Sequence, residues 1–202
     1  MYFATDPGLL RLERMMTLIP NFPLRFCGVR VYDTEIAPIG VSHNELVWNT
    51  MRHVRNLNFR KRLNDYIKER KAYAMNYRGM RHRVLFNNEL QKRENPSAAL
   101  LCALYLLTAD CRLWSRVKQS VNARGIQFQG IKLGELSPEA YTLYMTAKDL
   151  YCGTKYITVS DLADKEIVSP QMFGILCEAM TIRRYGMAAL SLENGKEDRQ
   201  NG

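Results

Sequence analysis

The stretch Ala98-Ala-Leu-Leu-Cys-Ala-Leu-Tyr-Leu-Leu107 holds ten residues, none of them charged, and is the longest apolar run in the chain. A membrane-spanning helix needs roughly 18 such residues, so the run predicts a helix that is buried in a protein core. Asn95-Pro96-Ser97, directly before it, is typical of a helix start. Because the run is apolar on nearly every side, we expect this helix at the centre of the fold.

Helix signals continue on the C-terminal side of this run. Thr108-Ala-Asp110 is expected to end the helix and to cap another one, and Ser137-Pro138-Glu139 opens a further helix that Gly153 ends. Between these two helices, glycines alternate with apolar residues and indicate a loop or a small hairpin near 124–134. These glycines are Gly125, Gly130 and Gly134.

The N-terminal side has similar signals. Ser42-His-Asn-Glu45 has the spacing of a capping box, in which the Ser and Glu side chains bond reciprocally to the backbone of the first helical turn. Apolar residues at helical spacing predict a helix over about 59–77, which Gly79 can terminate. Nearer the N-terminus, Asp6-Pro7 has the pattern of a helix start, and residues 24–41 have the pattern of one or two short extended segments.

Together these signals predict a mainly α fold, a helical bundle with a short extended N-terminal segment and a possible small hairpin. The chain then divides into four parts, an N-terminal helix and extended segment (1–41), a basic helical segment (42–94), a C-terminal helical domain (95–192) and a polar tail (193–202).

The positive charge of the chain is concentrated in one segment. The 202 residues include 29 Lys+Arg and 20 Asp+Glu, which gives a net charge of +9 and a pI of about 9.4. Thirteen of the basic residues and only three acids lie between Arg52 and Arg93, a net charge of +10, so the rest of the chain is close to neutral. A concentrated basic helix face attracts polyanions through phosphate neutralisation and counterion release.

A helical projection of residues 59–77 places apolar and basic side chains in adjoining sectors. The residues that we expect to contact phosphates are Arg60, Lys61, Lys68, Lys71, Arg78, Arg81 and Arg83. Two other interpretations remain open, a solvated basic face and contact with an acidic surface of another protein. The tyrosines of the apolar sector (Tyr66, Tyr73 and Tyr77) are expected in the core, and this sector is too polar to favour membrane binding.

Residues 157–186 resemble a bacterial helix-turn-helix, since a short helix capped by Ser160 is followed by a longer one that begins at Ser169-Pro170 and ends at Gly186. Gln171, with Arg183 and Arg184 at the far end, would form a possible second binding surface, and Glu178 would face the groove as well. The alternative is a pair of packed helices in which Phe173, Leu176, Met180 and Tyr185 belong to the core.

Residues from about 80 to 186 also resemble a small protein family of unknown function that occurs in Firmicutes, often on mobile elements. The segments that carry the resemblance are Val84-Leu-Phe86-Asn-Asn-Glu89, Ala103-Leu-Tyr-Leu-Leu107, Arg112, Ile131-Lys-Leu, Thr146-Ala-Lys-Asp-Leu-Tyr151, Gly153 and Glu178-Ala-Met-Thr-Ile-Arg-Arg-Tyr185. The resemblance implies an α-helical accessory protein without assigned chemistry.

The residue types used in catalysis and metal binding form no pattern in this sequence. The five cysteines (Cys27, Cys102, Cys111, Cys152 and Cys177) are widely spaced, and we expect them to be reduced and structural, as in a cytoplasmic protein. Four of them lie in apolar helical patterns, where a free cysteine is expected to be buried. The three histidines (His43, His53 and His82) lack the spacing of metal ligands. No nucleotide-binding or hydrolase motif is present, so the expectation is no enzyme, no cofactor and no metal.

Two functions fit these observations. The first is a non-enzymatic nucleic-acid-binding accessory or regulatory protein of a bacterial or phage mobile element, with DNA or RNA as its partner. The second is an anti-defence inhibitor, similar to an anti-CRISPR protein, that contacts a nuclease or its bound nucleic acid. Neither requires a membrane, and the sequence leaves the oligomeric state open.

Overall fold

The computed structural model describes residues 42–70, 75–123 and 125–191. The expected N-terminal helix, the extended segment of residues 24–41 and the polar tail lie outside these residues. In chain order, the described elements are α2 (His43–Met51), α3 (Leu57–Glu69), α4 (Met80–Gln91), α5 (Ala98–Thr108), α6 (Cys111–Val117), η3 (Lys118–Ser120), β1 (Val121–Asn122), β2 (Gly125–Ile126), α7 (Pro138–Cys152), α8 (Val159–Ala163), α9 (Pro170–Tyr185) and α10 (Met187–Ser191). The prediction of a mainly α fold is confirmed.

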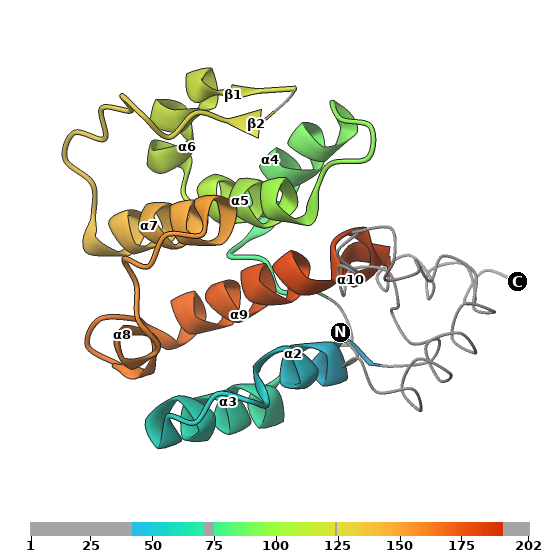
Figure 1. The fold of residues 1–202 in the computed structure, drawn as a ribbon, viewed down its shortest axis with the longest axis vertical. Helices are drawn as coiled ribbons and strands as arrows, with labels where there is room; N and C mark the ends of the chain where they lie inside the picture. Colours follow the sequence, from blue (N-terminus) through green and yellow to red (C-terminus); the bar gives the residue numbers. More distant parts are fainter. Residues whose placement is uncertain (1–41, 71–74, 124, 192–202) are drawn as a thin grey trace, which may run out of the picture.

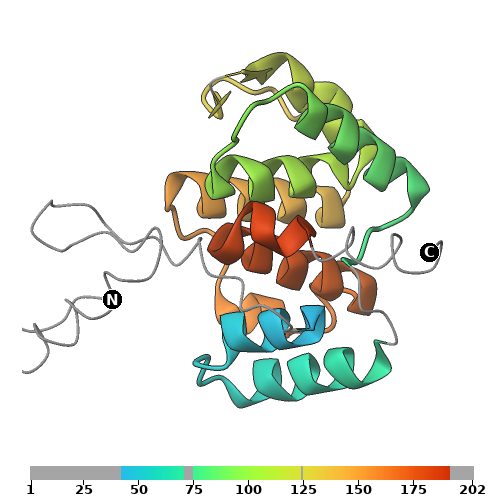
Figure 2. The ribbon, with the colours of Figure 1, turned by 90° about the vertical axis from the view of Figure 1, so that its right-hand side faces the viewer.

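Helix α9 lies in the middle of the bundle (Figures 1 and 2). Helices α5 and α7 cover one side of it, and α2 and α3 lie on the opposite side. Helices α4 and α6 and the β1–β2 hairpin lie beyond α5, on its side away from α9. One continuous hydrophobic core joins all these layers. Buried side chains of the basic segment and of the C-terminal helices pack together in it.

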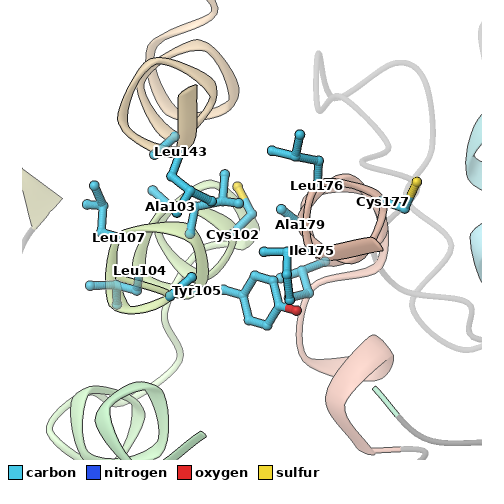
Figure 3. Close-up of a cluster of buried hydrophobic side chains, with 14 of the residues drawn as sticks. Cys102, Ala103, Leu104, Tyr105, Leu107, Leu143, Ile175, Leu176, Cys177 and Ala179 are labelled. Atoms are coloured by element: carbon cyan, nitrogen blue, oxygen red, sulfur yellow. The ribbon is translucent and has the colours of Figure 1, made fainter. Parts of the chain in front are cut away.

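The apolar run quoted above forms α5, and every residue from Leu100 to Thr108 is buried. Its partner α9 is buried along most of its length as well. Figure 3 shows Cys102 and Tyr105 of α5 facing Ile175 and Ala179 of α9. The expectation that the run forms a central helix is therefore confirmed.

Several helix boundaries follow the local signals. Ser42 and Glu45 form the expected capping box at the start of α2. Ser137 and Ser169 each accept a backbone hydrogen bond at the start of a helix whose first residue is proline. Gly153 ends α7 in the left-handed conformation, with φ of 74°.

The helix predicted over 59–77 is shorter than expected. It begins at Leu57, because the side chain of Asn56 accepts a hydrogen bond from the backbone of Phe59, and it ends at Glu69. Arg70 leaves the helix in an extended conformation with its side chain bonded to Glu178 of α9. Gly79 does not terminate this helix and is instead the N-cap residue of α4.

The hairpin and the first helix of the expected helix pair also differ from prediction. The expected small hairpin is present and pairs Val121 with Ile126 and Asn122 with Gly125. It begins before the predicted range of 124–134 and ends within it, and residues 127–136 contain no strand. The side chain of Asn122 accepts a hydrogen bond from the Gly125 backbone and stabilises this tight turn. Helix α8 is capped by Thr158, which forms a capping box with Asp161, and Ser160 lies inside the helix.

His82 of α4 is buried against Tyr105 and Tyr77. Its Nδ1 accepts the backbone N–H of Arg78 at 3.1 Å, so the proton lies on Nε2, which donates to the carbonyl of Tyr105 at 2.8 Å. This arrangement needs the neutral ring, and burial lowers the pKa of His82 to about 4 from an ordinary value of 6.5.

We predict that this histidine makes the protein less stable in acid. His82 takes up a proton near pH 6.5 in the unfolded chain but only near pH 4 in the folded chain. Its contribution to the free energy of unfolding is therefore complete above pH 6.5 and is lost as the pH falls towards 4. The free energy of unfolding should fall by about 2 kcal/mol between pH 7.5 and pH 5 on this account alone. Urea denaturation of the wild type and of His82→Gln at both pH values checks this, because the free energy of unfolding should fall less in the Gln variant. Equal losses in the two proteins would contradict it.

Candidate nucleic-acid interface

The outer side of α3 carries three cations that point into solvent. Arg60, Lys61 and Lys68 are all exposed, and within the described ranges no hydrogen bond or ion pair involves their side chains. They share one sector of the helix with exposed Asn64 and Leu57. The acids of α3, Asp65 and Glu69, lie in the next sector, on the side of Lys61 away from Arg60. We call Arg60, Lys61 and Lys68 the α3 basic face.

Arg62, on the same helix, points inward and is 6% exposed. Its Nη1 donates to the carbonyls of Leu162 and Asp164, each at 3.0 Å, and its Nη2 donates to the carbonyl of Val168. The guanidinium also lies over the ring of Phe173, 4.6 Å from its centroid. Arg62 therefore joins α3 to the turn between α8 and α9 and offers nothing to a phosphate.

Arg70 is the second inward-facing cation of this segment. It forms an ion pair with Glu178 of α9, and the two side chains are 6% and 0% exposed. Glu178 also accepts hydrogen bonds from Nε2 of His43 at 2.5 Å and from the hydroxyl of Tyr66 at 3.2 Å. These four residues form a buried polar cluster that joins α2 and α3 to α9.

This cluster corrects two expectations. Glu178 was expected to face a groove of nucleic acid, but it is buried because three polar partners from α2 and α3 cover it. Tyr66 is part-buried against Phe173, and Tyr77 packs beside Tyr105, so the prediction that these tyrosines belong to the core is confirmed. Tyr73 lies outside the described residues.

Arg78 lies where the N-termini of three helices meet. Its guanidinium is 2.7 Å from Glu139 in the first turn of α7 and 3.8 Å from Asp110, the N-cap residue of α6. Glu139 in turn accepts a hydrogen bond from Ser169, the N-cap residue of α9. Two carboxylates thus balance the charge of Arg78, which makes it a poor phosphate ligand compared with the α3 basic face.

Arg81 and Arg83 lie on a different part of the molecule. Both are exposed on α4, where Arg83 lies over the ring of Tyr77, 5.9 Å from its centroid. Helices α3 and α4 are on opposite sides of the α5–α9 layer in both views (Figures 1 and 2). The basic segment, continuous in sequence, is therefore divided between two separate surfaces. Lys71 lies outside the described residues.

The possible second surface on α9 consists of one exposed residue and two anchored ones. Gln171 is exposed, and its amide donates to the carbonyl of Arg78 at 3.4 Å. Arg183 donates to the carbonyl of Leu150, and Arg184 to that of Asn49, so both connect α9 to its neighbours. Because α9 is buried along most of its length, its middle presents no face to a groove.

The cysteines only partly follow expectation. Cys102 and Cys177 are buried, and burial raises the pKa of both thiols, that of Cys102 to about 12. Cys111 and Cys152 are exposed, because they occupy the first position of α6 and the last position of α7, and the prediction that they are buried is wrong. In the part of the chain that the structure describes, no group of three His, Cys, Asp or Glu residues could hold a metal ion.

None of the helices in residues 42–70, 75–123 and 125–191 is long and apolar enough to cross a membrane. No protein-family model, curated protein or solved structure matches the chain. The resemblances of residues 80–186 and 157–186 therefore stay predictions.

Proposed function

We propose that this protein is a non-enzymatic nucleic-acid-binding accessory or regulatory protein, with the α3 basic face as its main phosphate-binding surface. A role in a bacterial or phage mobile element follows from the resemblance of residues 80–186 and belongs to the same proposal. Nucleic acid, as DNA or RNA, is the partner whose charge pattern fits best.

The observation that carries the proposal is that the cations of α3 and its C-cap residue fall into two groups, those bonded within the fold and those exposed to solvent. Arg62 and Arg70 are bonded to carbonyls and to Glu178, whereas Arg60, Lys61 and Lys68 remain in solvent without a partner among the described residues. Arg60 and Lys68 are eight positions apart, about 12 Å along the helix. This span matches several successive phosphates of a nucleic-acid strand, which follow one another at about 3.4 Å of helix rise.

Charge reversal of this face tests the proposal. The triple variant Arg60→Glu, Lys61→Glu, Lys68→Glu should bind duplex and single-stranded DNA and RNA roughly 100-fold more weakly at low salt, because it loses phosphate contacts and adds repulsion. Gel-shift titrations at two salt concentrations measure this. The fold should remain, since all three side chains are exposed.

The matched control is Arg112→Glu, Lys132→Glu, Lys155→Glu, which changes the net charge by the same amount at exposed positions away from α3. This variant should retain most of the affinity. If the two triple variants lose affinity equally, general charge rather than the α3 basic face is responsible. If the wild-type protein binds no nucleic acid at low salt, the proposal is wrong.

One observation favours a second candidate function, an anti-defence inhibitor that contacts a nuclease or its bound nucleic acid. Met80 and Val84 are 73% and 48% exposed, and they lie four residues apart on one side of α4. Arg81 and Arg83 flank them. Methionine and arginine beside an exposed apolar patch are typical of protein–protein interfaces.

A purified CRISPR or restriction nuclease distinguishes this candidate from the first. An inhibitor should co-elute with the nuclease and reduce its cleavage, and Met80→Asp with Val84→Asp should abolish both effects. The pair Ile167→Asp and Met187→Asp, also exposed apolar residues, should leave both effects intact. An inhibitor unaffected by the changes on α4 would rule out this surface.

A further inference from the structure

A groove lies between α4 and α6 and is closed at one end by the β1–β2 hairpin. Arg78 ties the residues before α4 to Asp110 at the start of α6, and Arg93, after α4, bonds to the carbonyl of Asn122 beyond α6. The two helices therefore run alongside each other, on the same side of α5 (Figure 1). The groove has a volume of about 600 Å³, within the usual range of small-molecule sites.

The lining of this groove combines three kinds of side chain. Trp114, which is 8% exposed, provides an aromatic wall together with apolar Leu85. Asn88 and Gln119 provide amides that can both donate and accept hydrogen bonds. Lys118, the first residue of η3, provides a cation with no hydrogen bond or ion pair among the described residues.

The remaining charges of the groove are fixed by a buried carboxylate. Glu89 accepts hydrogen bonds from Lys92 at 2.5 Å and from Arg93 at 2.9 Å. Burial alone would raise the pKa of Glu89, but these hydrogen bonds outweigh it and hold the pKa below the ordinary value, so the carboxylate is ionised. With Lys118, the three cations and one carboxylate give the groove a net charge of +2.

We propose that this groove binds one nucleoside phosphate unit, either a free nucleotide or the phosphorylated end of a strand. The base would lie against Trp114 with its edge facing the amides of Asn88 and Gln119, and Lys92 and Lys118 would contact the phosphate. Arg93 is a positioning residue, because its guanidinium joins Glu89 to the backbone of Asn122 and fixes the wall of the groove. The inference takes its ligand class from the proposed function, but it concerns a separate surface from the α3 basic face.

Tryptophan fluorescence tests the groove directly. The chain has two tryptophans, so the variant Trp48→Phe leaves Trp114 as the only reporter. Titration of this full-length protein with the four nucleoside 5′-monophosphates should give a saturable change in fluorescence. Adenosine and inorganic phosphate should each bind at least about tenfold more weakly than AMP, because each makes only half of the contacts.

Lysine variants in the same background locate the site. Lys118→Glu should weaken AMP binding at least tenfold, whereas the matched surface change Lys155→Glu should leave it unchanged. A 5′-phosphorylated hexanucleotide distinguishes the two sources of ligand, since equal affinity for AMP and the strand indicates a free nucleotide and tighter strand binding indicates a strand end. Calorimetric titration of the wild-type chain gives the same comparison if Trp48→Phe perturbs the fold.

Three outcomes would overturn the proposal. These are no saturable signal with any nucleotide at millimolar concentration, equal binding of AMP and inorganic phosphate, or loss of AMP binding in the α3 triple variant but not in Lys118→Glu. The experiments can contradict the proposal for the groove and the proposed function independently of each other. Nucleic acid that shifts on gels without nucleotide binding overturns only the groove, and nucleotide binding without any gel shift overturns only the α3 basic face.

Discussion

Replacing Glu178 by leucine is expected to lower the free energy of unfolding by about 3–5 kcal/mol, because the change leaves buried charge without its partner. Glu178 is fully buried, and its carboxylate is the shared acceptor for Arg70, His43 and Tyr66. Removal of the carboxylate leaves the guanidinium of Arg70 inside the bundle with its charge uncompensated. Urea denaturation of the purified variant measures the loss.

A double variant separates the charge from the packing. Arg70→Met with Glu178→Leu replaces both partners by apolar side chains, and buried ion pairs replaced in this way often lose little stability. We therefore expect the double variant to be more stable than Glu178→Leu alone. Glu69→Leu, at an exposed position of α3, serves as the control and should change stability by less than about 0.5 kcal/mol. A loss below about 1 kcal/mol for Glu178→Leu would contradict the role of the cluster.

Replacing Arg62 by methionine is the second large effect that we expect, with a loss of about 2–4 kcal/mol. Arg62 donates to the carbonyls of Leu162, Asp164 and Val168, which surround the turn between α8 and α9. Methionine fills a similar volume but removes the donor of the Leu162 and Val168 carbonyls, whereas the Asp164 carbonyl keeps the backbone N–H of Val168 at 3.1 Å. It also loses the contact with the ring of Phe173.

The neighbouring residue provides the control for this prediction. Lys61→Met changes an exposed cation on the same helix and should have little effect on stability. The stability of Arg62→Lys should lie between those of Arg62→Met and Lys61→Met. An ammonium group keeps the charge, but it lacks the planar fork with which a guanidinium reaches three carbonyls. Hydrogen exchange should show the backbone of residues 159–168 opening first in Arg62→Met. Equal stability of Arg62→Met and Lys61→Met would contradict the structural role of Arg62.

Local signals were enough to predict much of the fold. The apolar run of α5, the capping box at Ser42, and the serine–proline starts of α7 and α9 each depend on residues only a few positions apart. The same reasoning misplaced the end of α3, because that end is fixed by the bond between Arg70 and Glu178, which are 108 residues apart. Pairing over such a distance leaves no periodic pattern in the sequence.

The candidate site shows the same limit. The number of charges identifies the basic segment, but it does not show which cations have partners. Arg62, Arg70 and Arg78 have partners within the fold, whereas the α3 basic face has none in the part of the chain that the structure describes. One signal was present, since on a helical projection Arg70 falls inside the apolar sector, between Phe59 and Leu63, and Arg62 falls at its edge, next to Tyr66. A cation in such a sector is seldom buried unless it has a partner. The groove between α4 and α6 had no signal, because its lining comes from four separate elements, α4, α6, η3 and β1.

The salt dependence of duplex DNA binding tests the central claim most directly. Each phosphate contact contributes about −0.9 to the slope of log K against log salt concentration. If Arg60, Lys61 and Lys68 all contact phosphates, the charge-reversed triple variant should have a slope shallower than that of the wild type by about 2.7. The control variant with changes at Arg112, Lys132 and Lys155 should keep the wild-type slope. Equal slopes for the wild type and the α3 variant would contradict the claim that this face binds nucleic acid.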